Sequence, residues 1–562
     1  MAERTRVASR AELNVFEWRG SRRGNSPLTP ARVIGVVAKE GEYPAVREFF
    51  ELFKTPWEFY VPGREYDVVL CSGEQRVEKS ARLVVVYGKQ ENKVAKSSAG
   101  VGQLAVRSDA GDRIPIYGDC FALPCDGRVL LSVDGSGECA AFEETVDGQQ
   151  RVHVGYDLFY EVRYLLTKGQ PAAEARVPTL ELHISFLRNV MIRASIRVVE
   201  IPPVPAGYKF IACLTHDVDH PAIRHHFFDH TMFGFFYRAT VGSSVDFLRG
   251  RKSLKQLVLN VAAALSLPLM YLGWVKDAWA QFDRYAEIER GASSTFFVIP
   301  KRDDAGVALD KTPAPKRAAK YSVADIRNEL QSIAKAGCEI GVHGIDAWNN
   351  AKAARRELDE IRPLTNNREV GVRMHWLYFD ENSHAALDEA GFSYDSTCGY
   401  NQTVGYRAGT LQVFKPLLSN RLLELPMHVM DTALFFGGYS NFSPKQAKVT
   451  VRELMEHARK FGGVLTFNWH DRSIAPERLW DETYVGFLEE LRSKGAWITN
   501  AGQAVAWFRK RRSAEIDESE NGINDSSPLR EALPGLRLQI HEKSFGAAEP
   551  NRIEAEKALC ST

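Results

Sequence analysis

The strongest constraint on the fold is an alternation of strand-like and helix-like segments that begins near residue 209. Amphipathic helices are expected at 323–336 and 502–508, where apolar residues recur at helical spacing. The strands expected from short apolar runs are 210–214, 294–299, 338–342, 463–467 and 497–499. Repeated strand–helix units indicate a parallel sheet, either open or closed into a barrel. In such folds the chemistry lies at the carboxyl ends of the strands.

Polar side chains gather directly after these strands. Asp217 and Asp219 follow the first strand and, being two positions apart in an extended segment, face the same side. Two carboxylates in one site repel each other unless a cation or a shared proton intervenes. A solvated turn or a structural histidine explains any one cluster alone, but four clusters at strand ends favour one functional site. The other three are His343–Gly344, Arg373–Met374–His375 and Asn468–Trp469–His470–Asp471.

A group of three prolines and a change in composition divide the chain into three parts. Residues 1–205 predict a smaller α/β domain of unknown role, because they contain strand and helix patterns but no chemical motif. The parallel sheet is expected within 206–512, with a helical insertion at about 221–291. Residues 513–562 are polar and acidic, so we expect a largely disordered tail with a short strand at 536–540. Its removal should leave stability nearly unchanged.

One apolar run, 257–275, is long enough to cross a bilayer. Asn260, Ser266 and Pro268 interrupt it, and the proline splits the pattern into two short pieces. A helical hairpin packed on the rest of the protein is the favoured interpretation. A membrane-facing insertion is the second, and a full span is the least favoured.

Composition limits the partners and the compartment. Among 562 residues the formal net charge is +1, so no global charge favours nucleic acid and we expect no nucleic-acid partner. Eight cysteines without a CxxC pair indicate free thiols in a reducing compartment. The start of the chain is charged and has no apolar core typical of a secretory signal. We therefore expect a cytoplasmic protein, and the sequence does not indicate its oligomeric state.

The motifs occur in a familiar order. THDVD, TFFV, EIGVHG, GVRMH, YDST and FNWH resemble the motifs of the NodB-homology polysaccharide deacetylases, also called carbohydrate esterase family 4, over roughly 209–512. The spacing of the first motif is similar to that of a DxD variant. The resemblance implies an α/β fold with a distorted (β/α) barrel. It also implies a hydrolase that uses a divalent metal, expected to be zinc, to remove an acetyl group from an N-acylated sugar of a polysaccharide or glycan precursor.

The same resemblance implies a role for each matched residue. Asp217 matches the catalytic base, and Asp219 matches a metal ligand. His343 matches the first metal-binding histidine. Arg373 matches the arginine that orients the base, and His470 matches the general acid.

The chain departs from the family pattern at Ala347, where the second metal-binding histidine is expected. A catalytic zinc site needs three protein ligands, so another residue must supply the third. His375 is the expected ligand, because it lies two positions after Arg373 and faces the same side in an extended loop. Asp346 is the alternative, and this choice stays open at the level of sequence.

Three tryptophans, Trp348, Trp376 and Trp469, are adjacent to motif residues. Aromatic faces stack on sugar rings, and Trp376 and Trp469 are the candidates for substrate binding, although core packing is favoured for at least two of the three. Two other functions stay open. One is a catalytically silent barrel that binds glycan or scaffolds a complex, which Ala347 favours; the other is a related amidohydrolase that acts on a non-sugar amide.

Overall fold

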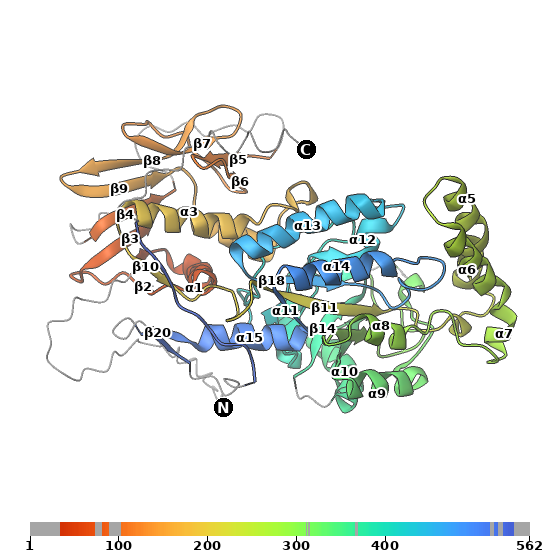
Figure 1. The fold of residues 1–562 in the computed structure, drawn as a ribbon. Helices are drawn as coiled ribbons and strands as arrows, with labels where there is room; N and C mark the ends of the chain where they lie inside the picture. The colour runs from red at the N-terminus through yellow and green to blue at the C-terminus, as the bar shows by residue number, and fades with distance from the viewer. Residues whose placement is uncertain are drawn as a thin grey trace, which may run out of the picture. The chain divides into compact units, whose positions relative to one another are not determined.

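The computed structural model describes two nine-stranded sheets with helices packed against them, and two further sheets of two strands each (Figure 1). It describes residues 34–73, 81–88, 103–310, 312, 315–365, 369–517, 522–525 and 532–543. All of these belong to one compact unit, Val33–Thr562. The first sheet ends before the group of three prolines, and the second begins after it.

The first sheet mixes parallel and antiparallel strands in the order β2-β1-β3-β4-β9-β8-β7-β5-β6. The ladder is parallel from β2 to β9 and antiparallel from β9 to β6. The strands are β1 (Ile34–Val37), β2 (Trp57–Phe59), β3 (Tyr66–Ser72), β4 (Ala81–Tyr87), β5 (Ala105–Ser108), β6 (Arg113–Pro115), β7 (Arg128–Val133), β8 (Cys139–Val146) and β9 (Gln149–Val154). They share an apolar core with α1 (Tyr43–Phe53), α2 (Leu158–Thr167) and α3 (Thr179–Arg193). This part is α/β, and its standing as a separate domain, 1–205, stays a prediction.

The second sheet is entirely parallel and has the order β16-β15-β14-β13-β12-β11-β18-β17, with β19 also paired to β11. Its strands are β11 (Phe210–Val218), β12 (Thr295–Val298), β13 (Glu339–Gly344), β14 (Gly371–Met374), β15 (Tyr394–Asp395), β16 (Leu423–Glu424), β17 (Val429–Met430), β18 (Val464–Asn468) and β19 (Ala496–Thr499). Among the described residues, β16 and β17 do not pair, so the sheet is a half-barrel. The predicted parallel sheet is therefore confirmed.

The central strand β11 explains the order of the sheet. All nine of its residues are buried, as expected for a strand that has neighbours on both edges and helices on its faces. Amphipathic helices cover the sheet and turn their apolar sides to a common core. They are α9 (Arg327–Lys335), α10 (Ala351–Ile361), α11 (Ser383–Ala390), α12 (Asp431–Phe435), α13 (Pro444–Phe461) and α14 (Asp481–Ser493). Helix α15 (Ala501–Ser513) packs instead in a second cluster with Ile211, Cys213 and Val464.

The expected helical insertion lies between β11 and β12. Its helices are α4 (His230–Tyr237), α5 (Ser243–Leu248), α6 (Leu254–Leu265), α7 (Leu267–Tyr271) and α8 (Phe282–Ile288). The apolar run 257–275 is split as expected, since Pro268 stands in the first turn of α7. Ala263, Met270 and Trp279 belong to a small core within the insertion. No helix in the described part of the chain is both long enough and apolar enough to cross a membrane.

The C-terminal segment differs from the expected disordered tail. Strand β22 (Gln539–His541) pairs antiparallel with β10 (Val198–Glu200), and Leu533 and Leu536 pack against a buried cluster that includes Trp507. The Trp507 indole N–H also donates a hydrogen bond to Pro534 O at 3.1 Å. The strand expected at 536–540 overlaps β22 at residues 539 and 540, but the expectation of a disordered tail is wrong for 532–543, because a few apolar positions meet partners that the segment's own composition does not reveal. Residues 544–562 lie outside the described residues.

The docked segment predicts a measurable contribution to stability. Truncation after Arg512 removes the leucine contacts and the β10–β22 pairing, which should lower the free energy of unfolding by roughly 2–4 kcal/mol. Truncation after Lys543 keeps all of these contacts and serves as the control. Thermal unfolding of the three proteins checks the prediction, and equal melting temperatures would show that the segment contributes nothing.

Candidate metal centre

The carboxyl ends of four parallel strands bring the predicted polar clusters together. Strand β11 ends at Val218, between the two aspartates, and His343 lies in β13 opposite Arg373 of β14 in the ladder. The residues that meet at this edge of the sheet are Asp217, Asp219, His343, Arg373, His375 and His470. Parallel register thus converts positions far apart in the sequence into one cluster.

Three of these residues have the spacing of metal ligands. One donor atom from each of Asp219, His343 and His375 lies within 4.8 Å of the others. The Nε2 atoms of His343 and His375 are 3.3 and 3.6 Å from Asp219 Oδ1. That oxygen is buried and accepts no hydrogen bond from any described residue. Two imidazole nitrogens and one carboxylate oxygen form the donor set of a three-ligand catalytic site, so the residues fit a divalent cation.

The orientation of His343 supports this interpretation. Its Nδ1 lies 2.9 Å from the carbonyl oxygen of Arg373 and can only donate there. The proton therefore belongs on Nδ1, which leaves the lone pair of Nε2 free to bind a cation.

The two candidates for the third ligand lie in different places. His375 faces Asp219, whereas Asp346 Oδ1 accepts a hydrogen bond from Val307 N at 2.7 Å and is outside the cluster of ligand atoms. Ala347 is fully buried in the core. The structure thus places His375, and not Asp346, beside Asp219 and His343.

The backbone turns sharply after His375. Trp376 and Leu377 have φ values of 63° and 54°, in the left-handed region that side chains with a Cβ rarely adopt. Asn401 Nδ2 donates a hydrogen bond to Trp376 O at 3.1 Å and helps to hold this turn. His375 is consequently buried toward Asp219, while the next side chain, Trp376, is 43% exposed. Such strain at a polar site is typical of a functional loop.

Asp217 is held by two donors. Arg373 Nη1 lies 2.9 Å from its Oδ1, and Asn468 Nδ2 lies 2.7 Å from its Oδ2. Burial raises the pKa of Asp217, but the charge of Arg373, helped by His343, lowers it more, so the pKa is below its usual value. Asp217 is therefore an oriented, ionised carboxylate that can accept a proton.

His470 is held by a residue that sequence reasoning missed. Its Nδ1 lies 2.6 Å from Asp431 Oδ1, and its backbone N–H donates to Asp431 Oδ2 at 2.7 Å. Burial lowers the pKa of His470, but Asp431 raises it more, to about 9. A protonated imidazole at this position can act as an acid. Asp431 follows the end of strand β17, as the other site residues follow their strands. That strand has only two residues, so the sequence does not reveal it.

The two tryptophans proposed for substrate binding have different environments. Trp469 is fully buried and stacks on Tyr484, with ring centroids 5.0 Å apart. The prediction that Trp469 binds substrate is wrong, since neighbouring side chains at the end of a strand point to opposite sides and His470 takes the side of the site. Trp348 is buried as well. Trp376 alone among the three is exposed beside the cluster.

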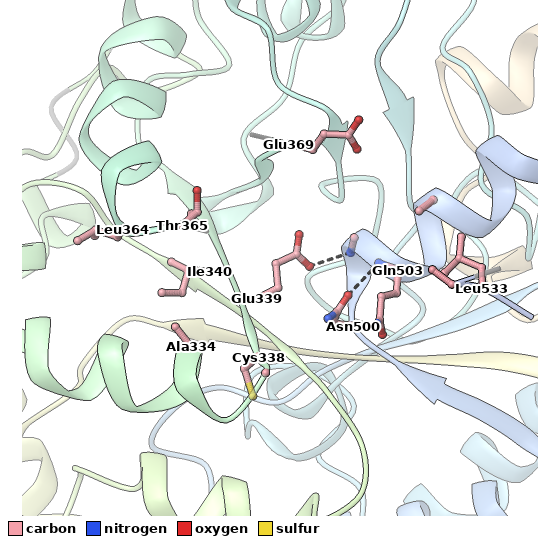
Figure 2. A pocket seen from close by; sticks show the side chains of 14 residues that line it. Ala334, Cys338, Glu339, Ile340, Leu364, Thr365, Glu369, Asn500, Gln503 and Leu533 are labelled. Carbon is pink, nitrogen blue, oxygen red and sulfur yellow. Dashed lines mark hydrogen bonds between the residues drawn. The ribbon is translucent and has the colours of Figure 1, made fainter. Parts of the chain in front are cut away.

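A cavity of about 540 Å³ lies elsewhere on the sheet (Figure 2). Its walls include Cys338, Glu339 and Ile340, at the start of β13, and the helix N-terminus at Asn500 and Gln503. Asn500 Oδ1 accepts a hydrogen bond from Gln503 N. None of the metal-ligand candidates lines this cavity, because it lies at the amino end of β13 and they lie at the carboxyl ends of the strands.

Among the known proteins compared with this chain, only solved structures are similar to it. No protein-family model matches the chain, and no curated protein matches it. A protein described as a polysaccharide deacetylase from Mycobacterium smegmatis is 18% identical, and the match covers 55% of this chain and 94% of that one, with a TM-score of 0.35. The PuuE allantoinase is 13% identical over 54% of this chain and 92% of its own, with a TM-score of 0.34.

A third structure matches a longer part of the chain. Agd3, described as a novel carbohydrate deacetylase, is 8% identical, and the match covers 85% of this chain and 87% of Agd3, with a TM-score of 0.31. Polysaccharide and carbohydrate deacetylases, the class that the sequence motifs resemble, are thus among the solved structures to which this chain is similar. At these identities and TM-scores the likeness does not assign an activity to this chain.

The geometry predicts which substitutions weaken metal binding. Purified protein should carry about one divalent ion per chain, and Asp219→Ala, His343→Ala and His375→Ala should each lose it, because two remaining ligands bind poorly. Asp346→Ala should keep the ion and is the matched control. Metal analysis after dialysis checks this. Full occupancy in the first three variants, or loss in Asp346→Ala alone, would contradict the assignment.

Proposed function

We propose that this protein is a metal-dependent hydrolase that removes an acetyl group from an N-acylated sugar in a polysaccharide or glycan precursor. The observation that carries the proposal is the grouping of a three-residue ligand set, Asp219, His343 and His375, with a held carboxylate and a held imidazole at one edge of the sheet. This combination contains every protein group that amide hydrolysis at a metal centre requires. The motif resemblance supports the choice of an acetylated sugar.

The ligand set Asp219, His343 and His375 would hold the cation, and its nitrogen and oxygen donors favour zinc. When bound, such an ion supplies polarisation of the acyl carbonyl and a lowered pKa of water at this position. The ligands are buried or half-buried, which limits competition from bulk solvent.

Asp217 is the proposed base. It takes a proton from the attacking water, whose oxygen forms the new bond to the acyl carbon. Arg373 and Asn468 keep the carboxylate oriented for this step, and Arg373 keeps it ionised. Each carboxylate oxygen has a further lone pair after accepting its hydrogen bond, so the proton has a place to go.

His470 is the proposed acid. It gives a proton to the sugar nitrogen as the bond between that nitrogen and the acyl carbon breaks, which leaves acetate and a free sugar amine. Asp431 fixes Nδ1 of the ring, so that Nε2 faces the cluster, 3.9 Å from Asp219 Oδ2. Trp376, exposed beside His375, is the proposed stacking surface for a sugar ring.

The acid–base roles predict large losses of rate without loss of metal. Asp217→Asn and His470→Ala should each lower deacetylation by about 10²–10⁴, because each removes a positioned proton transfer. Acetate release from N-acetylglucosamine oligosaccharides by metal-loaded protein is the measurement, with Asp346→Asn as the control. A variant that keeps the parent rate disproves the role of its residue.

The same assay separates the proposal from its two alternatives. A silent glycan-binding barrel would bind metal and oligosaccharide but release no acetate. A hydrolase of non-sugar amides would leave the oligosaccharides intact and would open a cyclic ureide such as allantoin. Either result would overturn the deacetylase proposal.

Asp431 is proposed to act through His470, which gives a separate prediction. Asp431→Asn should lower kcat by about 10–100-fold, as is typical when a supporting hydrogen bond is lost, with KM and metal content unchanged. The double variant Asp431→Asn/His470→Ala should lose no more than His470→Ala alone, because the two residues act as one unit. Additive losses in this cycle would show that Asp431 acts independently of His470.

A further inference from the structure

The outer side of the helical insertion is unusually apolar. Leu248 is 82% exposed, Leu265 is 72% exposed and Trp274 is 74% exposed, and several further large apolar side chains between them are exposed as well. Soluble proteins rarely leave a contiguous apolar surface of this kind uncovered. Figure 1 shows α5, α6 and α7 as neighbouring helices; Leu248 ends α5, Leu265 ends α6, and Trp274 follows α7.

Helix α6 has apolar residues on two opposite sides. Leu254, Val258 and Leu265 are exposed and follow helical spacing of four and seven residues, so they form one outward stripe. Ala263 and Ala264 point the other way, into the small core of the insertion. Helix α6 thus leaves an apolar stripe exposed in addition to the apolar side that it buries, and exposed apolar stripes of this kind are normally covered by a partner.

Four basic residues lie just before or at the start of α6, and a fifth follows α7. Residues 247–276 contain five lysines and arginines, Arg249, Arg251, Lys252, Lys255 and Lys276, and no aspartate or glutamate. Lys276 pairs with Asp283, and Lys252 donates hydrogen bonds to Ser243 and Glu477. Within the described part of the chain no ion pair is recorded for the other three, all of which are exposed. The surface therefore combines an apolar stripe with positive charge that the protein itself does not neutralise.

We propose that this surface docks on a lipid bilayer that contains anionic lipids. An interfacial helix of this type buries its apolar side at the boundary between headgroups and acyl chains, and its basic residues attract anionic headgroups. Trp274, which follows α7 and is 74% exposed, has a side chain of a type enriched at this boundary. The inference stands on the surface of the insertion and does not depend on the proposed function.

The charge pattern distinguishes a bilayer from a second copy of the chain. A symmetric dimer formed through this surface would cover the apolar stripe, but residues 247–276 contain no acidic residue that could pair with the basic residues of the other copy. Like charges placed together at an interface oppose association. An anionic lipid surface would cover the apolar stripe and would also neutralise the basic residues.

The test is co-sedimentation of the full chain with vesicles of phosphatidylcholine and phosphatidylglycerol, compared with vesicles of phosphatidylcholine alone. The protein should prefer the anionic vesicles, and salt should weaken binding. The triple variant Leu254→Gln/Val258→Gln/Leu265→Gln should bind the anionic vesicles at least roughly tenfold more weakly than the parent protein. The separate variant Arg251→Glu/Lys255→Glu should show a loss of the same size. All five positions are exposed, so melting temperatures should not change.

A matched control is available on α13, where Lys445, Lys448 and Val449 are also exposed. Lys445→Glu/Lys448→Glu/Val449→Gln should bind vesicles like the parent protein. If the triple variant misfolds, vesicle binding by Arg251→Glu/Lys255→Glu is the deciding measurement. Absence of vesicle binding by the parent, or equal binding by parent and both variants, overturns the proposal. If the parent protein does not bind vesicles but forms a dimer, and the triple variant is a monomer, the surface is a dimer interface instead.

Discussion

Arg373 of β14 and Asp217 of β11 form a buried ion pair that joins two strands which are not neighbours in the half-barrel. The guanidinium also donates to Thr215 Oγ1, Ser396 O and Ser396 Oγ, so its donors connect β14 to β11 and to the end of β15. Loss of one partner of such a pair leaves an uncompensated buried charge, at a cost of roughly 3–5 kcal/mol. The backbone oxygen of the same arginine fixes the ring of His343. The proposed base and one metal-ligand candidate therefore depend on one residue.

The sequence could predict the parts of this site that follow the longer strands. Strand register requires long apolar runs, so the ends of β11, β13 and β18 could be located from the sequence to within a few residues. The polar residues after them, with Asp219 and His343 among them, were predicted to meet for that reason. His375 could be chosen over Asp346 because side-chain direction alternates in an extended segment.

Other parts of the site have no local signal. Asp431 and Ser396 follow strands of two residues each, which pair with the longer strands β18 and β14 and are too short to give a pattern in the sequence. Trp469 lies next to a site residue in sequence but on the other side of the chain, so adjacency alone gave the wrong prediction. The C-terminal segment was misjudged for a related reason, since its leucines are stabilised by contacts with residues far away in the sequence.

The pairing of β10 with β22 places a timing constraint on biosynthesis. Val198 lies opposite His541, so this contact joins residues more than half the chain apart. A ribosome must deliver the chain as far as His541 before the pairing can form, whereas β1 to β9 emerge earlier and have their own core. Until then, the β10 edge stays open to any other extended segment. Strand β22 thus closes an edge that a nascent chain leaves exposed while all the strands from β11 to β21 are made.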